Sequence, residues 1–146
     1  MPGIVVGVDG SVHAQHALEW AMREAAIRRA PLMVVTVYHA NVGYWGSELS
    51  YPPDHAVAEH ARQGARDAVA KAAAQFGEPG PASVTIEAVS GVPAEELLKA
   101  TRDADMIVVG SRGAGGFTRL LIGSVSNQII HQAHCPVVVV RPVDSN

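Results

Sequence analysis

The feature that most constrains this chain is a set of short, uninterrupted apolar runs separated by segments with helical periodicity. Clear examples are IVVGV at 4–8, MIVV at 106–109 and VVVV at 137–140. A strand buried on both faces reads as such a run, because neither of its faces meets water. We therefore expect a parallel sheet that carries helices on both faces.

Strands and helices alternate along the whole chain. The expected strands cover 3–9, 32–38, 83–89, 105–110 and 136–140. The expected helices are one between Ser11 and Pro31, a long one that includes Val57 to Phe76, a short one from Pro93 to Thr101 and one that begins near Ser124. This β-α-β-α-β-α-β-α-β order predicts right-handed crossovers and an open five-stranded sheet. A length of 146 residues favours one domain, 1–146.

Composition excludes several classes of protein. Hydrophobic residues make up 48% of the chain and charged residues 17%, which is ordinary for a globular protein. The net charge of −3 comes with no basic stripe, so nucleic-acid binding is not expected. No apolar run approaches the ~20 residues that span a bilayer. The N-terminus MPGIVVGVDG has no basic region before its apolar run, so we expect a cytoplasmic protein and not a secreted one.

The segment GSRGAGGFTRLLIGS at 110–124 holds five of the fourteen glycines, between an apolar run and a helix-like segment. Glycine is costly to order, so such a cluster suggests that backbone must approach a ligand closely. Gly110 and Gly113 are placed to bring N–H groups near a ligand. Gly123 precedes an expected helix start, where unpaired N–H groups and the helix dipole favour an anion such as phosphate.

Side chains of the same segment add to this expected anion site. The hydroxyls of Ser124 and Ser126 are available to donate hydrogen bonds, and Arg112 and Arg119 are available to add positive charge. The segment contains neither G-x-x-x-x-G-K-[ST] nor a complete G-x-G-x-x-G, because Thr118 stands where the third glycine belongs. A Walker P-loop is therefore excluded and a Rossmann oxidoreductase is disfavoured.

A carboxylate follows the first expected strand, in Val8-Asp9-Gly10-Ser11. Ligands of open α/β sheets lie outside the carboxyl ends of the strands. If the first and fourth strands are neighbours, Asp9 and the glycine-rich segment face one cleft. A carboxylate there can accept hydrogen bonds from ribose hydroxyls.

The glycine spacing is G-x2-G-x9-G-S, and with it the chain resembles the ATP-binding branch of the universal stress protein family. VVGVDGS at 5–11, GSRG…IGSVS at 110–126 and HCPVVVVRP at 134–142 carry the resemblance, which covers nearly the whole length. It implies a Rossmann-like fold of the adenine nucleotide alpha hydrolase type, with strand order 3-2-1-4-5. It also implies a homodimer that pairs through the last strand, 136–141, and a role in the stress response.

The resemblance also implies roles for individual residues. Asp9, with Gly7 beside it, would lie near the ribose and adenine, and Val37 would contact adenine through its backbone. The remaining positions would hold ribose and phosphates or form the flap over the phosphates: Gly110, Arg112, Gly113, Ala114, Gly115, Gly116, Gly123, Ser124, Val125 and Ser126. The long loop 39–54 matches nothing in the family pattern.

Three functions remain open at this point. The first is an ATP-binding regulatory protein that a protein partner reads, with any Mg²⁺ held mainly by the phosphates. The second is a slow ATPase or nucleotidyl-transfer enzyme with a substrate under the 39–54 loop, although no positioned base or nucleophile is evident. The third is a dimeric interaction module with a degenerate site or one for AMP or cyclic AMP.

Two further residue types point to no separate chemistry. His13 and His16 stand three apart, as do His131 and His134, but neither pair has a clear third metal ligand. The single cysteine, Cys135, rules out an internal disulfide, and its position before an apolar run indicates a small buried hydrophobe.

Overall fold

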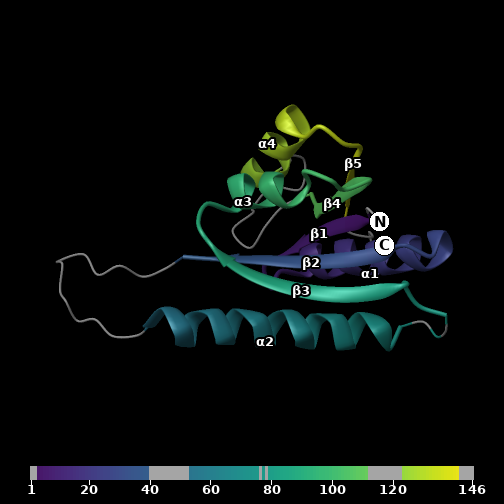
Figure 1. The fold of residues 1–146 in the computed structure, drawn as a ribbon, viewed down its shortest axis with the longest axis horizontal. Coiled ribbons are helices and arrows are strands. Elements are labelled where there is room, and N and C mark those ends of the chain that lie inside the picture. Colours follow the sequence, from purple (N-terminus) through teal and green to yellow (C-terminus); the bar gives the residue numbers. More distant parts are fainter. Residues whose placement is uncertain (1–2, 40–52, 76, 78, 112–122, 142–146) are drawn as a thin grey trace, which may run out of the picture.

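The computed structural model describes residues 3–39, 53–75, 77, 79–111 and 123–141 (Figure 1). Within these residues, strands and helices alternate in the expected order. The elements are β1 (Ile4–Val8), α1 (Val12–Arg28), β2 (Pro31–Tyr38), α2 (Pro53–Ala73), β3 (Ser83–Ser90), α3 (Pro93–Ala100), β4 (Met106–Gly110), α4 (Ser124–Gln132) and β5 (Val137–Val140). Residues 40–52 of the long loop expected at 39–54 lie outside the described part.

All five strands form one parallel sheet in the order β3-β2-β1-β4-β5, which confirms the expected fold. The central strand β1 pairs with β2 and β4, so Ile4 lies opposite both Leu32 and Met106. Strand order therefore reverses beside β1, and the carboxyl ends of β1 and β4 are neighbours. This is the position where open α/β sheets bind ligands.

Helix α1 begins and ends at the positions that the sequence predicts. The hydroxyl oxygen of Ser11 accepts a hydrogen bond from the Ala14 N–H (3.1 Å), which caps the first turn. Arg29, in the left-handed region with φ of 55°, ends the helix two residues before Pro31. The buried face of α1 consists of Ala14, Ala17, Leu18, Ala21, Met22 and Ala25. The four alanines of this face let α1 lie close to the sheet.

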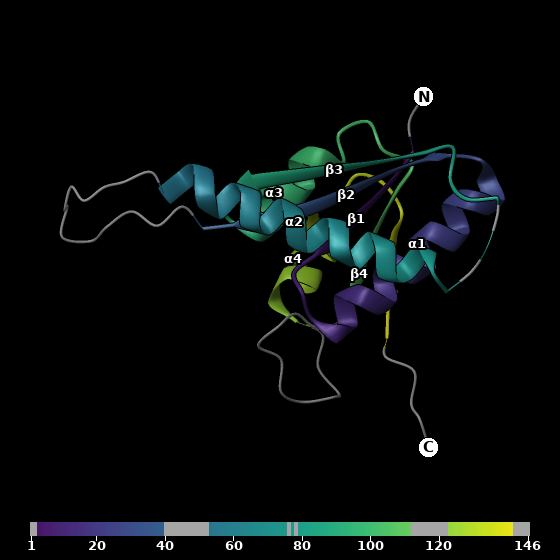
Figure 2. The same ribbon diagram turned by 90° about the horizontal axis from the view of Figure 1, so that it is seen from below.

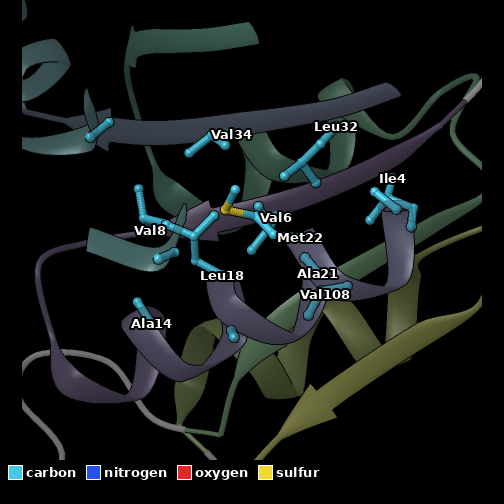
Figure 3. Close-up of a cluster of buried hydrophobic side chains, with 14 of the residues drawn as sticks. Ile4, Val6, Val8, Ala14, Leu18, Ala21, Met22, Leu32, Val34 and Val108 are labelled. Carbon is cyan, nitrogen blue, oxygen red and sulfur yellow. The ribbon is translucent and has the colours of Figure 1, made fainter. Parts of the chain in front are cut away.

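Successive residues of each strand point into two separate cores. Ile4, Val6 and Val8 of β1 pack with α1 and α2 (Figure 3), whereas Val5 packs on the α3 and α4 side. The same alternation holds in β4, where Val108 faces α1 and Ile107 faces the other way. Because both faces are covered, the strands read as continuous apolar runs.

The two faces of the sheet are covered by helices of very different length. Helices α1 and α2, with 17 and 21 residues, run along one face (Figure 2). Helices α3 and α4, with 8 and 9 residues, lie on the other face (Figure 1). Eight helical residues extend ~12 Å, whereas the eight-residue strand β2 extends ~26 Å. Helices α3 and α4 therefore span a smaller part of their face than α1 and α2 span of theirs.

No helix among the described residues is both long enough and apolar enough to cross a membrane.

Candidate functional site

A hollow of about 120 Å³ lies at the carboxyl ends of β1, β2 and β4, on the face that carries α3 and α4. Its lining is mostly apolar, with one carboxylate and the start of α4 at its border. The lining residues are Gly7, Val8, Asp9, Ala14, Val35, Val37, Pro93, Leu97, Val109, Gly110, Val125 and Ser126. Six positions singled out from the sequence thus surround one hollow: Gly7, Asp9, Val37, Gly110, Val125 and Ser126.

The first turn of α4 reaches this hollow without a side-chain cap. Gly123 is the N-cap residue, and the first bond within the helix runs from the Asn127 N–H to the Gly123 carbonyl (2.9 Å). Within the described chain, no backbone acceptor pairs with the N–H groups of Ser124, Val125 or Ser126. The first turn also carries no acidic side chain. Three N–H groups and the positive end of a helix dipole therefore favour an anion here.

Ser126 fixes α4 to the end of β4. Its hydroxyl donates to the Gly110 carbonyl at 2.5 Å, and the side chain is buried. The Ser126 hydroxyl, which the sequence led us to expect as a donor to a ligand, thus donates its proton to a backbone carbonyl of the protein. Ser126 positions the first turn of α4, and its backbone N–H is left without a backbone acceptor among the described residues.

Gly110 has a packing role that the sequence did not reveal. A Cβ at this position would lie 2.7 Å from the His13 carbonyl oxygen, a backbone atom that cannot move independently. Glycine therefore lets the first turn of α1 approach the end of β4. The close approach found at Gly110 is between two protein segments.

Asp9 lies directly after β1, where its exposed carboxylate borders the hollow. Its Oδ1 accepts a hydrogen bond from the Ser11 N–H (2.9 Å), which orients the side chain. Gly10 follows with φ of 86°, a conformation that allows the sharp turn into α1. A carboxylate has about four lone-pair positions, so Asp9 can accept further hydrogen bonds from a ligand.

The interior of the hollow is apolar and includes residues that sequence reasoning missed. Val35 and Val37 come from β2, and Pro93 and Leu97 come from α3. A Cβ on Gly7 would lie 3.0 Å from the Leu97 methyl carbons, so glycine keeps the space between β1 and α3 open. Val35 could have been found, because it stands two residues before Val37 and so shares its face. Pro93 and Leu97 carried no such signal.

The other predicted site residues are not among the described residues that line the hollow. Gly123 and Ser124 adjoin the lining at the start of α4. Arg112, Gly113, Ala114, Gly115 and Gly116 lie outside the described residues, as does Arg119.

The histidines and the cysteine carry no catalytic arrangement in the described structure. No group of three His, Cys, Asp or Glu side chains suited to a metal occurs there. His134 lies beyond the end of α4 at Gln132, so it does not share a helix with His131. Burial raises the pKa of the Cys135 thiol, and the nearby Asp105 carboxylate raises it further. The thiol therefore stays protonated at neutral pH and is a poor nucleophile.

An apolar hollow, a carboxylate and an uncapped helix start lie together at the strand-order reversal, which is where proteins of the open parallel α/β class bind their ligands. The chain belongs to the universal stress protein family, whose model matches residues 2–141. A universal stress protein of Mycobacterium tuberculosis is 37% identical over 145 residues, which is 98% of this chain and 49% of the relative. One from Mycolicibacterium smegmatis is 37% identical over 146 residues, 97% of this chain and 49% of the relative. The chain thus spans about half the length of these curated relatives.

Solved structures share the fold. The universal stress protein UspA from Lactobacillus plantarum has a TM-score of 0.79 at 23% identity, over 96% of this chain and 97% of that one. A universal stress protein in complex with cAMP has a TM-score of 0.67 at 25% identity, over 96% of each chain.

Proposed function

We propose that this protein binds ATP and acts as a nucleotide-dependent regulator. The single observation that carries the proposal is the uncapped first turn of α4 beside an apolar hollow and the Asp9 carboxylate. Phosphates would accept hydrogen bonds from the N–H groups of 124–126. The base would enter the hollow between β2 and α3, and Asp9 would accept hydrogen bonds from the ribose.

Support for an adenine nucleotide comes from the similar structure that is a complex with cAMP. The preference for ATP over AMP or cyclic AMP rests on the family resemblance of the glycine-rich segment. Under this proposal the residues outside the described part, Arg112 to Gly116, cover the phosphates. The described lining offers a single carboxylate, Asp9, so phosphate oxygens would supply most ligands of a bound Mg²⁺.

We also propose that residues 1–146 form one domain, and that this domain pairs with a second copy through the last strand, residues 136–141, which contains β5. Strand β5 is an edge of the sheet, and the side chains of Val137–Val140 are only partly buried. An exposed apolar edge strand is a ready template for pairing with another chain. Sedimentation of the purified protein would show a dimer, and Val138→Lys would shift it to the monomer if β5 forms the interface.

A pair of substitutions at Ser124 separates the role of a backbone N–H at the start of α4 from that of the side-chain hydroxyl. Proline is tolerated at the first helical position, and Gly123 already has the extended ψ of 164° that a residue before proline prefers. Ser124→Pro therefore deletes one N–H and should keep the helix. The matched control Ser124→Ala deletes the hydroxyl and keeps the N–H.

Isothermal titration of both variants with ATP gives the outcome. Ser124→Pro should lose about tenfold or more in affinity, since a hydrogen bond to a charged group contributes roughly 1.5–3 kcal/mol. Ser124→Ala should stay near the parent protein. Equal affinities in all three proteins would reject the proposed phosphate site.

A weak ATPase is the rival function, and the fate of bound ATP separates the two. We expect ATP to remain intact over many minutes with purified protein, because the described lining holds no pair of groups suited to acid–base chemistry. Chromatography of the nucleotide after incubation measures this. Turnover of many equivalents per minute would reject the regulatory function.

A further inference from the structure

A second hollow, of about 610 Å³, lies at the amino ends of β1, β2 and β3, at the opposite end of the sheet from the candidate nucleotide site. Val5 and Met33 in its lining face the side of α3 and α4, so both hollows lie on the same face of the sheet. The end of α3 and the turn that follows it form one wall. The volume falls within the range of small-ligand sites, roughly 300–1,000 Å³.

The floor of this second hollow is a row of side chains at one level of the sheet. Val5 of β1 lies opposite Met33 of β2, which in turn lies opposite Thr85 of β3. Val5 is buried, Met33 is half-buried and Thr85 is exposed. The cover over this face therefore decreases from β1 to β3, which leaves a largely apolar floor that a ligand can reach. Methionine adapts its shape to irregular partners, so Met33 suits such a floor.

The rim of the second hollow carries charges of both signs. Lys99, Arg102 and Asp103 belong to the lining, and Lys99 forms an ion pair with Glu96 (3.2 Å). Neither Arg102 nor Asp103 has a side-chain hydrogen bond or an ion pair with another described residue. A cation and an anion on consecutive residues, both without such a partner, therefore border the same apolar floor.

The turn that carries Arg102 and Asp103 is fixed to the rest of the protein. The Ala104 N–H donates to the Thr101 carbonyl (3.0 Å), and the Thr101 side chain is buried. The Asp105 N–H donates to the Gly3 carbonyl (2.8 Å), which joins the turn to the start of β1. A backbone that is already ordered lowers the entropy cost of binding a ligand beside it.

We propose that the second hollow binds a free α-amino acid with an apolar side chain. The side chain would lie on Met33, the α-carboxylate would approach Arg102, and the α-ammonium would approach Asp103. An α-amino acid carries both charges on one carbon atom, which matches opposite charges on consecutive residues. A fatty acid would leave Asp103 without a partner, and an uncharged peptide segment would use neither charge. This site is independent of the proposed nucleotide site.

The methyl resonances of ¹³C-labelled methionine provide a local measurement. L-leucine should shift the Met33 resonance and leave that of Met22 unchanged, because Met22 packs on the other face of the sheet. L-leucine amide lacks the carboxylate, and N-acetyl-L-leucine lacks the ammonium group. Each derivative should bind about fivefold more weakly than L-leucine, which is the contribution expected of one exposed ion pair.

Two charge variants connect each group of the ligand to one residue. Arg102→Gln should weaken L-leucine about fivefold and leave the binding of L-leucine amide unchanged. Asp103→Asn should also weaken L-leucine about fivefold, but it should leave the binding of N-acetyl-L-leucine unchanged. This reciprocal pattern would not arise from a general loss of stability.

A third variant fills the second hollow. Thr85→Trp should abolish the response of Met33 to L-leucine, and because Thr85 is exposed on a strand, tryptophan need not fit into a core there. Thr85→Val, which keeps the size of threonine, is the matched control and should bind L-leucine like the parent protein. An unchanged Met22 resonance shows that each variant is folded.

Three outcomes would overturn this inference. The first is a Met33 resonance that does not respond to L-leucine up to about 10 mM. The second is a derivative, either the amide or the N-acetyl compound, that binds as well as L-leucine. The third is L-leucine binding that neither charge variant weakens. None of these outcomes bears on ATP binding, so failure of this site and failure of the proposed function are distinguishable.

Discussion

The two faces of the sheet differ in what their helices do. On one face, α1 and α2 run the length of the strands, and their alanines lie close against β1, β2 and β4. On the other, α3 and α4 have 8 and 9 residues against 17 and 21 for α1 and α2, and the 120 Å³ hollow lies among their residues. The comparison teaches that long helices supply a continuous core, whereas short helices place two helix starts beside a space for a ligand.

The largest expected effect is a loss of stability that should differ between the two cores when one leucine of each is shortened. Leu18 of α1 is fully buried, so Leu18→Ala should lower the free energy of unfolding by about 2–5 kcal/mol. Leu97→Ala should cost less, because the Leu97 side chain already borders a hollow. Urea denaturation of both variants measures the difference. A larger loss of unfolding free energy for Leu97→Ala than for Leu18→Ala would contradict the difference between the two faces.

Gly110 joins the two faces, because it is packed against α1 and lies beside α4. Gly110→Ala should destabilise the protein by about 1–3 kcal/mol, since the new methyl group would meet the His13 backbone. Thermal denaturation gives the magnitude. A variant as stable as the parent would mean that α1 does not approach β4 as closely as described.

Ser126→Ala should have a smaller effect, about 1–2 kcal/mol, because one buried hydrogen bond to the Gly110 carbonyl is lost. The effect on ATP affinity should be modest, since the backbone N–H remains. Denaturation and titration of the same sample measure both quantities. A loss of ATP affinity greater than the loss from Ser124→Pro would show that the Ser126 hydroxyl contacts the ligand after all.

The smallest effect on stability is expected at Gly7. Gly7→Ala brings a methyl group to 3.0 Å from the end of the Leu97 side chain, which can turn away. The free energy of unfolding should change by less than about 1 kcal/mol. ATP affinity should nevertheless fall, because the methyl group narrows the hollow. A stability loss as large as that of Gly110→Ala would contradict the expectation that the Leu97 side chain can turn away from the new methyl group.

Much of the fold could be predicted from the sequence because each strand carries its own signal. The apolar runs at β1, β4 and β5 and the Ser11 cap marked elements correctly. The order 3-2-1-4-5 came from the family resemblance, since local patterns do not state which strands pair. The start of α2 at Pro53 was missed, because its periodic apolar positions begin only at Val57.

The candidate site could be predicted from the sequence only in part, and the reason is physical. Asp9 and the start of α4 have signatures in adjacent residues, so sequence alone located them. The contacts Gly110–His13 and Ser126–Gly110 join residues far apart in the chain, and no local pattern encodes them. Leu97 and Pro93 line the hollow only because α3 packs across β1 and β2, which requires the three-dimensional arrangement.

The most direct test follows the backbone amides of Ser124, Val125 and Ser126 by ¹H–¹⁵N correlation spectroscopy during titration with ATP and, separately, with adenosine. The account predicts that ATP moves these three amide resonances much more strongly than adenosine does, whereas both ligands move signals of the hollow such as Val37. Amides at 124–126 that do not respond to ATP, in a protein that binds it, would contradict the claim that the start of α4 holds the phosphates.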